Sequence, residues 1–348
     1  MADEIRIGMV GAGMIGQLAH LANFTQIPGC RVTALAELRP RLGALAAEKF
    51  GVPAVFDTHR EMLAANVIDA AVVVTRRPAT GPVVLDVLSA GKHVLSEKPM
   101  AHTTAQASRL VESAARRQLT YSIGFMKRHD EGTAAAKQLF EEFIDNNKLG
   151  RVVLMRGWCF CGEFNIRSDG FVMTDESRPD GLELWPSAPD WLPKKFHEDY
   201  AWFLNVFVHD VNILRFFAGR QLTVRGADLT RRNGRIVIFD AGDYPVVLEM
   251  GEQTGTDWNE GVEIQFERGR LTLVFPSPLL SNQAASVTLV QGNKTTVIPI
   301  GPSWSFRRQA EAFVADIAGR HPGLASGADS VADLELVEAI WRMHLGLN

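Results

Sequence analysis

The chain has 348 residues and a mass of 38.3 kDa, a length that predicts two domains. Hydrophobic residues make up 46% and charged residues 22%, proportions that exclude a disordered or fibrous protein. The net charge of −4 and the even spread of arginine argue against a nucleic-acid partner. The sequence has no apolar run of the roughly 18 residues that a membrane span needs.

Three cysteines, Cys30, Cys159 and Cys161, predict free thiols in a reducing cytoplasm. Cys159 and Cys161 would share one face of a strand without good disulfide geometry. The chain has no fourth cysteine that would complete a zinc site, and we predict no metal. The acidic start, Met1 to Glu4, runs at once into a strand, and we expect no secretory signal.

The first 123 residues alternate strand and helix. Apolar runs predict strands, and stretches closed by glycine or proline predict helices. The strands are expected at 5–10, 31–36, 69–75, 93–96 and 120–124, and the helices up to 26 and at 39–50, 80–90 and 103–118. This order predicts an α/β fold, with a doubly wound parallel sheet of Rossmann type over 1–123.

Residues 124–348 have a different pattern and predict an α+β domain with a large, mostly antiparallel open sheet. Asn233-Gly234 and Gly292-Asn293 predict hairpins within the strand-rich stretch 222–300. Helices are expected at 132–147, 202–217, 304–319 and 329–345, with the last helices able to pack back on the first domain.

The stretch 161–201 predicts a long irregular segment. It mixes prolines, Trp185, Trp191 and many charges. Loops of this length are usually functional or disordered. Two interpretations stay open: aromatic and charged groups of a sugar or polyol pocket, with Trp185 against the substrate, or a solvated surface excursion.

Gly11-Ala12-Gly13-Met14-Ile15-Gly16 is a G-x-G-x-x-G turn directly after the first strand. In such a turn the first glycine makes the bend, the second lets a pyrophosphate approach the backbone, and the third lets helix and strand pack closely. The amides at the helix start, from Met14 to Gly16, are suited to phosphate. The pattern predicts a dinucleotide site.

Glu37 follows the second strand, about 20 residues after the glycines, where an acidic residue accepts the ribose hydroxyls of NAD. Arg39 can instead bind a 2′-phosphate or stack on adenine. We predict NAD as cofactor, with NADP as the alternative.

A second motif is the stretch Gly91-Lys92-His93-Val94-Leu95-Ser96-Glu97-Lys98-Pro99. It contains a strand that is expected to end at the carboxyl edge of the sheet, where ligands bind in open α/β folds. Glu97 and Lys98 project there. Spacing alone also allows an exposed ion pair.

Together with the glycine-rich turn, this stretch resembles the Gfo/Idh/MocA family of NAD(P)-dependent sugar and polyol oxidoreductases. The resemblance extends over nearly the whole chain. It includes Gly124-Phe125-Met126-Lys127-Arg128, the strand-rich second half and the closing helices. It implies that Lys98 assists proton transfer near the nicotinamide. It also implies that the second sheet lines the substrate and joins copies in a homodimer or homotetramer. We expect Glu97 to position Lys98 or the nicotinamide side of the cofactor rather than to react, and we place both Glu97 and Lys98 at the cofactor.

The resemblance assigns His209 as the catalytic histidine. In a helix over 202–217, Asn205, His209 and Asn212 would form one polar stripe on an otherwise apolar surface. A core histidine satisfied by its neighbours is the alternative. Asn205 and Asn212 depart from the aspartates common in the family, and a neutral amide cannot raise the pKa of His209 as a carboxylate would.

Thr75-Arg76-Arg77 replaces the Thr-Pro-Asn often seen beside the nicotinamide. Thr75 and Arg76 are expected at the cofactor. The two arginines, Arg76 and Arg77, are suited to an anionic or highly hydroxylated substrate. The alternative interpretation is that the segment is a solvated loop. Lys127 and Arg128 are further candidates for substrate contact.

The sequence thus predicts an NAD-dependent oxidoreductase. It would transfer a hydride between nicotinamide and a secondary alcohol or ketone of a sugar, polyol or glycoside. Lys98 and His209 would transfer protons, and Asn205 would orient a hydroxyl. Two alternatives remain: a glycosidase that uses NAD for transient oxidation, and a non-catalytic NAD-sensing regulator.

Overall fold

The structure is a computed structural model that describes residues 4–162, 169–177, 180–255, 257–321 and 323–347. The described residues fall into two compact units. The first lies within 1–125, 168–201 and 306–331, and the second within 126–167, 202–305 and 332–348. Parts of the irregular segment, 163–168 and 178–179, lie outside the described residues.

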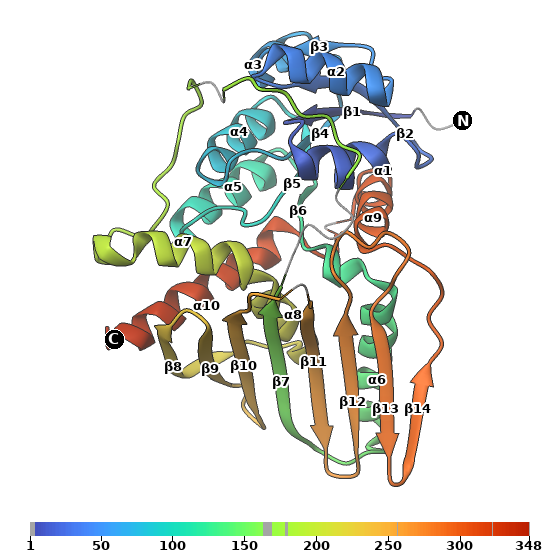
Figure 1. Ribbon diagram of the computed structural model, residues 1–348, viewed down its shortest axis with the longest axis vertical. Helices are drawn as coiled ribbons and strands as arrows, with labels where there is room; N and C mark the ends of the chain where they lie inside the picture. The colour runs from blue at the N-terminus through green and yellow to red at the C-terminus, as the bar shows by residue number, and fades with distance from the viewer. Residues whose placement is uncertain (1–3, 163–168, 178–179, 256, 322, 348) are drawn as a thin grey trace. The chain divides into compact units, whose positions relative to one another are not determined.

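The first unit is built on a six-stranded parallel sheet in the order β3-β2-β1-β4-β5-β6 (Figure 1). Its strands are β1 (Ile5–Val10), β2 (Cys30–Ala36), β3 (Val55–Phe56), β4 (Ala70–Val73), β5 (His93–Ser96) and β6 (Tyr121–Ile123). The predicted Rossmann sheet is confirmed. The strand order reverses between β1 and β4, which opens a crevice at their carboxyl ends.

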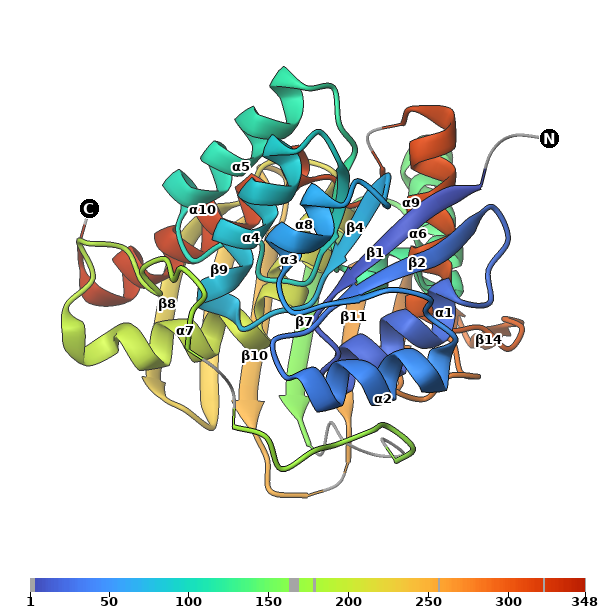
Figure 2. The same cartoon turned by 90° about the horizontal axis from the view of Figure 1, so that it is seen from above.

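Helices cover both faces of this sheet (Figure 2). They are α1 (Ala22–Phe24), α2 (Pro40–Phe50), α3 (His59–Ala64), α4 (Arg77–Ser89), α5 (Thr104–Arg116) and α9 (Ser305–Gly319). Leu21, Phe24, Leu42 and Phe313 are buried with β1 and β2 in one apolar cluster, so α1, α2 and α9 share a core. Burial of such side chains stabilises this face by about 1.5–3 kcal/mol each.

The second unit contains an eight-stranded sheet in the order β14-β13-β12-β11-β7-β10-β9-β8. Its strands are β7 (Val152–Cys161), β8 (Thr223–Arg231), β9 (Gly234–Asp240), β10 (Pro245–Glu252), β11 (Asn259–Phe266), β12 (Gly269–Phe275), β13 (Ser286–Gln291) and β14 (Lys294–Ile298). All neighbours are antiparallel except β7 and β10. The predicted open sheet and both predicted hairpins are confirmed.

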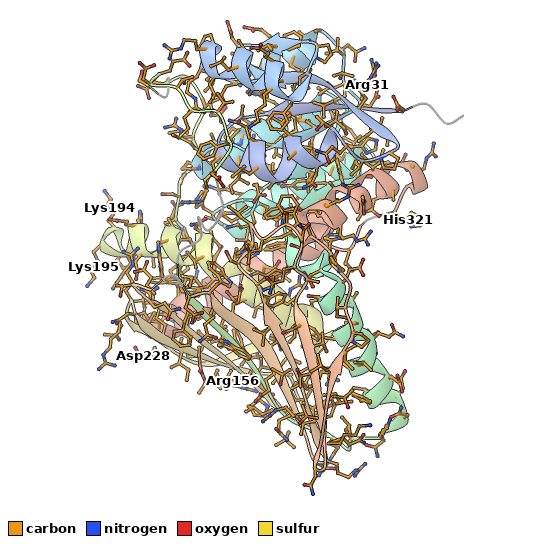
Figure 3. All side chains as sticks on the ribbon, turned by 45° about the vertical axis from the view of Figure 1, so that its right-hand side comes forward. Arg31, Arg156, Lys194, Lys195, Asp228 and His321 are labelled. Carbon is orange, nitrogen blue, oxygen red and sulfur yellow. The ribbon has the colours of Figure 1, made fainter. Side chains whose placement is uncertain are left out.

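Helices α6 (Glu131–Asn146) and α8 (Val208–Ala218) lie against one face of this sheet (Figure 1). Gly157 on β7 marks the close packing, because a Cβ there would lie 3.0 Å from the Leu214 side chain of α8. Arg156, labelled in Figure 3, points to the opposite, open face, where it pairs with Glu249 at 2.7 Å. None of the helices in the described part of the chain is long and apolar enough to cross a membrane.

The single helix expected over 202–217 was wrong. The chain forms α7 (His197–Val206) and α8, with a break at Phe207, whose backbone is near φ −89° and ψ −2°. The Phe207 ring packs edge-on against Trp202 at 5.1 Å and against Phe203 at 5.5 Å. Asn205 therefore lies on α7 while His209 lies on α8, and they do not form a stripe on one continuous helix. The last helix is α10 (Gly327–Leu345).

Candidate functional site

The glycine-rich turn is shaped by two close backbone approaches. Gly11 has φ +99°, and a Cβ there would lie 2.2 Å from the carbonyl oxygen of Val74. A Cβ on Gly16 would lie 2.4 Å from the carbonyl oxygen of Gly11. A Cβ on Gly13, in contrast, would meet no described atom within 4 Å. Two glycines are needed by the fold, and the third leaves space for a ligand.

The first helix starts directly at this turn. Gln17 donates its backbone N–H to Gly13 O at 2.9 Å, so the amides of Met14, Ile15 and Gly16 precede the helical hydrogen-bond ladder. The stretch Gly16–Leu21 is π-helical, a conformation frequent at functional sites. The amides and the positive end of the helix dipole are suited to bind phosphate.

A cleft of about 460 Å³ opens above the turn. Its walls come from the carboxyl ends of β1, β2 and β4 and from the segments that follow them. The lining residues are Val10, Gly11, Gly13, Met14, Ile15, Gly16, Ala36, Glu37, Leu38, Arg39, Asp57, His59, Val74, Thr75, Arg76, Arg77 and Leu182. The predicted cofactor residues of the glycine-rich turn, Glu37, Arg39, Thr75 and Arg76 are thus brought together here.

Glu37 connects the turn to the end of β2. It is only 5% exposed, and its Oε2 accepts a hydrogen bond from the Ala12 amide at 2.8 Å. Arg39 donates to both carboxylate oxygens, from Nε at 2.7 Å and from Nη2 at 3.1 Å. The Arg39 backbone N–H also donates to Oε1 at 3.2 Å, so Glu37 accepts four hydrogen bonds, about as many as a carboxylate has lone-pair positions. A ribose hydroxyl would therefore bind here in place of one of the Arg39 contacts. These residues fit an NAD cofactor.

Glu97 and Lys98 follow β5 at the same edge of the sheet. Glu97 Oε1 is bonded to His20 Nε2 at 2.8 Å, and Glu97 Oε2 accepts the Lys98 backbone N–H at 3.2 Å. A Cβ on Gly124 would lie 3.2 Å from Glu97, so the carboxylate is closely packed. Lys98 itself is half-buried and precedes a cis Pro99.

His20 is a site residue that the sequence did not single out. It is 2% exposed, and its ring stacks at 6.5 Å from Phe24 and edge-on at 6.0 Å from Phe306. Through Glu97, His20 connects the helix of the phosphate turn to the loop that carries Lys98. A lone histidine on an apolar helix gives no sequence signal for this contact.

In the second unit, Lys127 is buried and paired with Glu260 of β11. Trp258 Nε1 donates to Glu260 Oε2 at 2.9 Å. Burial lowers the pKa of Lys127, although Asp210 and the thiols of Cys159 and Cys161 oppose this shift. The predicted substrate contact Lys127 therefore lies in an internal ionic cluster.

Cys159, Asp210 and Glu260 form one group among the described residues that could offer metal ligands. Their ligand atoms lie within 4.8 Å of one another, and all three residues are buried. Lys127 already donates to Glu260, so the group contains its own cation. We assign no metal to it.

Arg128 and Asn212 belong to a second buried network. Arg128 Nε donates to Asn212 Oδ1 at 2.8 Å, and Asn212 Nδ2 donates to Asp333 Oδ2 at 2.7 Å. Arg215 Nε donates to Asp333 Oδ1 at 2.9 Å. Burial raises the pKa of Asp333 although Arg215 opposes the shift. These contacts connect α8 to α10 within the second unit.

His209 and Asn205 are both half-buried in the second unit. His209 lies in the first turn of α8, next to the buried Asp210, and Asn205 lies in the last turn of α7. Each therefore flanks the break at Phe207. Lys98 belongs to the first unit.

Trp185 lies on the first unit, against α4. Its backbone N–H donates to Pro78 O at 2.8 Å, and its ring packs so closely over Gly81 that a Cβ there would lie 2.3 Å away. The Arg109 guanidinium lies 5.3 Å from the ring centre. These contacts attach the irregular segment to the Rossmann unit.

Comparison with known proteins agrees with a nucleotide-binding Rossmann unit. A family model described as an oxidoreductase family with an NAD-binding Rossmann fold matches residues 5–125. An inositol 2-dehydrogenase of Rubrobacter xylanophilus is 27% identical over 77% of this chain and 71% of the relative. An inositol 2-dehydrogenase/D-chiro-inositol 3-dehydrogenase of Shouchella clausii is 33% identical over 54% of this chain. The aligned part spans 53% of that relative, about half of its length.

Two solved structures share the fold over nearly the whole chain. One is a 3-ketoreductase from Actinomadura kijaniata in complex with NADP and TDP-benzene, with a TM-score of 0.77, 20% identity and 98% coverage of both chains. The other is scyllo-inositol dehydrogenase from Lactobacillus casei with NAD(H) and scyllo-inositol, with a TM-score of 0.72 and 21% identity over 99% of this chain and 98% of that one.

The fold and the nucleotide cleft define an oxidoreductase with an NAD(P)-binding Rossmann domain. The match at 5–125 covers the glycine-rich turn, Glu37 and the Glu97-Lys98-Pro99 motif. Residues 5–125 match the Gfo/Idh/MocA family model, which agrees with the resemblance noted in the sequence.

Proposed function

We propose that the protein transfers a hydride between nicotinamide and a secondary alcohol or ketone of a sugar, polyol or glycoside, with NAD as its cofactor. The observation that carries this proposal is the cleft in which Glu37, the open Gly13 and the amides of the first helix meet. The names of the relatives, several of them inositol dehydrogenases, support a polyhydroxylated substrate.

Bound NAD supplies the hydride chemistry, and the protein supplies position and proton transfer. The neutral Lys98 amine would accept the hydroxyl proton when the alcohol is oxidised, and the resulting ammonium would return it to the oxygen when the ketone is reduced. Glu97, bonded to the Lys98 amide and to His20, would fix the backbone from which Lys98 projects. His209 would be the second proton-transfer group, and Asn205 would hold a substrate hydroxyl through its amide.

The first test is a panel of inositols, other polyols, aldoses, sugar acids and glycosides, with NAD or NADP and absorbance read at about 340 nm, where reduced nicotinamide absorbs. We expect reduction of NAD with at least one polyol or sugar. Chromatography of the same wells detects bond cleavage. Cleavage of a glycoside without net formation of NADH would show that the protein is a redox-assisted glycosidase rather than a dehydrogenase. Tight NAD binding without turnover of any substrate would favour the sensor.

We also propose a homodimer or homotetramer joined through the open face of the eight-stranded sheet. That face carries the exposed Ile236 and Ile238 beside charged residues such as Arg156 and Glu249, a mixture suited to a subunit interface. A cytoplasmic location fits the three free cysteines Cys30, Cys159 and Cys161.

A further inference from the structure

Two acidic residues of the irregular segment lie at the start of α2. Glu176 accepts the backbone N–H of Arg41 on Oε1 and that of Leu42 on Oε2, both at 2.9 Å. Thr174 donates its hydroxyl to Glu176 Oε2 at 2.8 Å. The neighbouring Asp175 accepts from Arg41 Nη2 at 2.7 Å. A remote segment thus supplies the carboxylate that caps this helix.

The helix has no such cap from its own sequence. Its N-cap residue is Arg39, which makes no side-chain capping hydrogen bond, and Pro40 follows in the first turn. A helix start with free amides and the positive dipole end attracts an anion. Glu176 supplies that negative charge, although it is 134 residues away from Leu42 in the sequence.

This helix start adjoins the nucleotide cleft. Glu37, Leu38 and Arg39 line the cleft and lead directly into Pro40, the first residue of α2. In a Rossmann fold the acidic residue after the second strand marks the adenosine ribose. NADP differs from NAD by a phosphate on the 2′-oxygen of that ribose. The groups that directly follow that acidic residue and could bind this phosphate are Arg39, Arg41 and the amides at the start of α2.

Each of these groups already holds a carboxylate. Arg39 is paired with Glu37 at 2.7 Å, and the Arg41 guanidinium with Asp175 at 2.7 Å. The two amides are taken by Glu176. A 2′-phosphate would have to displace these partners and would meet up to three negative charges.

We propose that Asp175 and Glu176 are specificity-determining residues that act with Glu37 to exclude NADP in favour of NAD. The inference rests on the proposed function, because it assumes that the cleft binds a nicotinamide dinucleotide. It gives the irregular segment a role at the cofactor, in addition to the substrate role considered from the sequence.

Two further observations support this role. Gln17 makes two hydrogen bonds to the backbone of Val172, at 2.8 and 2.9 Å, which anchors the segment close to the glycine-rich turn. Desolvation raises the pKa of Glu176, but hydrogen bonds from Arg41, Thr174 and Leu42 outweigh it and hold the pKa below its ordinary value. Glu176 is therefore charged at neutral pH.

The test compares the affinities of NADH and NADPH in the full-length protein, measured by the fluorescence of each reduced cofactor. Wild type is expected to prefer NADH. Glu176→Gln keeps the shape of the side chain and removes its charge, and should lower the NADH preference about 10-fold; Asp175→Asn with Glu176→Gln should lower it further. Glu183→Gln, an exposed acid of the same segment, is the matched control and should leave the preference unchanged.

Different results would overturn different claims. Equal weakening of both cofactors by Glu176→Gln, with an unchanged ratio, would make Glu176 only a structural cap and would contradict the inference. Wild type that binds NADPH as tightly as NADH would also contradict it, together with the choice of NAD over NADP, while the proposed hydride transfer would stand. Wild type that binds neither cofactor would overturn both claims.

Discussion

The glycines of the phosphate turn act differently at the scale of single atoms. Gly11 needs its positive φ and its contact with Val74, so Gly11→Ala should lower the unfolding midpoint. Gly13 faces open space, so Gly13→Ala should leave the midpoint within about 2 °C of wild type. The added methyl should instead weaken NADH binding at least about 10-fold, because the pyrophosphate must approach this backbone.

Thermal unfolding and fluorescence titration of the two glycine variants measure these effects. Loss of folding in Gly13→Ala would show that the fold needs this glycine. Unchanged NADH affinity in Gly13→Ala would show that the second glycine does not face the cofactor. Gly11→Ala serves as the matched variant, in which the fold is expected to be affected first.

The three cysteines should differ in reactivity because their environments differ. Burial raises the pKa of Cys30 to about 11. A hydrogen bond between the two thiols raises the pKa of Cys159 and lowers that of Cys161, which is half-buried. Iodoacetamide at mildly alkaline pH should therefore modify Cys161 first, because the thiolate is the reactive form. Mass spectrometry of digested protein checks the order, and faster labelling of Cys30 would contradict it.

Single residues were predictable where their chemistry follows from local sequence. The glycine spacing and Glu37 after β2 identify the nucleotide cleft, because the βα unit places them together. His20, Glu176 and Glu260 were not predicted. Their partners Glu97, Leu42 and Lys127 are 77, 134 and 133 residues away, and single-sequence spacing carries no information on such contacts.

At the scale of elements, strands and hairpins followed their sequence signals closely. Asn233-Gly234 and Gly292-Asn293 do join the antiparallel pairs β8–β9 and β13–β14. The break between α7 and α8 was missed, because Trp202, Phe203 and Phe207 continue a helical apolar pattern across it. The same rings pack on each other across the break, and Phe203 also packs edge-on against Trp341 at 6.1 Å, a contact between distant residues that the sequence pattern does not show.

We predict that the open face of the eight-stranded sheet is the interface of the homodimer or homotetramer. Ile236 and Ile238 of β9 are each 41% exposed and lie on one face, two residues apart. Changing both to aspartate should shift the protein toward a monomer with little change in unfolding midpoint, since neither side chain is in the core. Light scattering at fixed concentration measures the mass. An unchanged oligomer in the double variant would show that the interface does not lie on this face of the sheet. A monomeric wild-type protein would contradict the assembly proposal.

In the molecule as a whole, two histidines couple stability to pH, His102, which is buried, and His129, which is half-buried. Burial, aided by Arg77, lowers the pKa of His102 from 6.5 to about 4, and burial, aided by Arg128, does the same for His129. The unfolded chain binds these protons at the higher pKa, so stability is complete above pH 6.5 and is lost as pH falls toward 4. The expected loss is on the order of 3 kcal/mol for each imidazole.

Chemical denaturation between pH 4 and 7 measures this loss, with His129→Asn as the comparison. The variant should show a smaller fall in unfolding free energy over the same range. His102 lies in the first unit and His129 in the second, so both units should weaken on acidification. A flat stability profile in wild type would contradict the account.

In the proposed mechanism, Lys98 transfers the proton while the nucleotide cleft holds the cofactor. The most direct measurement pairs NADH titration with the turnover rate in wild type and in Lys98→Met, using the best substrate of the panel. We predict NADH affinity within about twofold of wild type and a turnover rate about 100-fold lower or more, the usual contribution of a general acid–base group. Full turnover by Lys98→Met, with NADH bound normally, would contradict the claim.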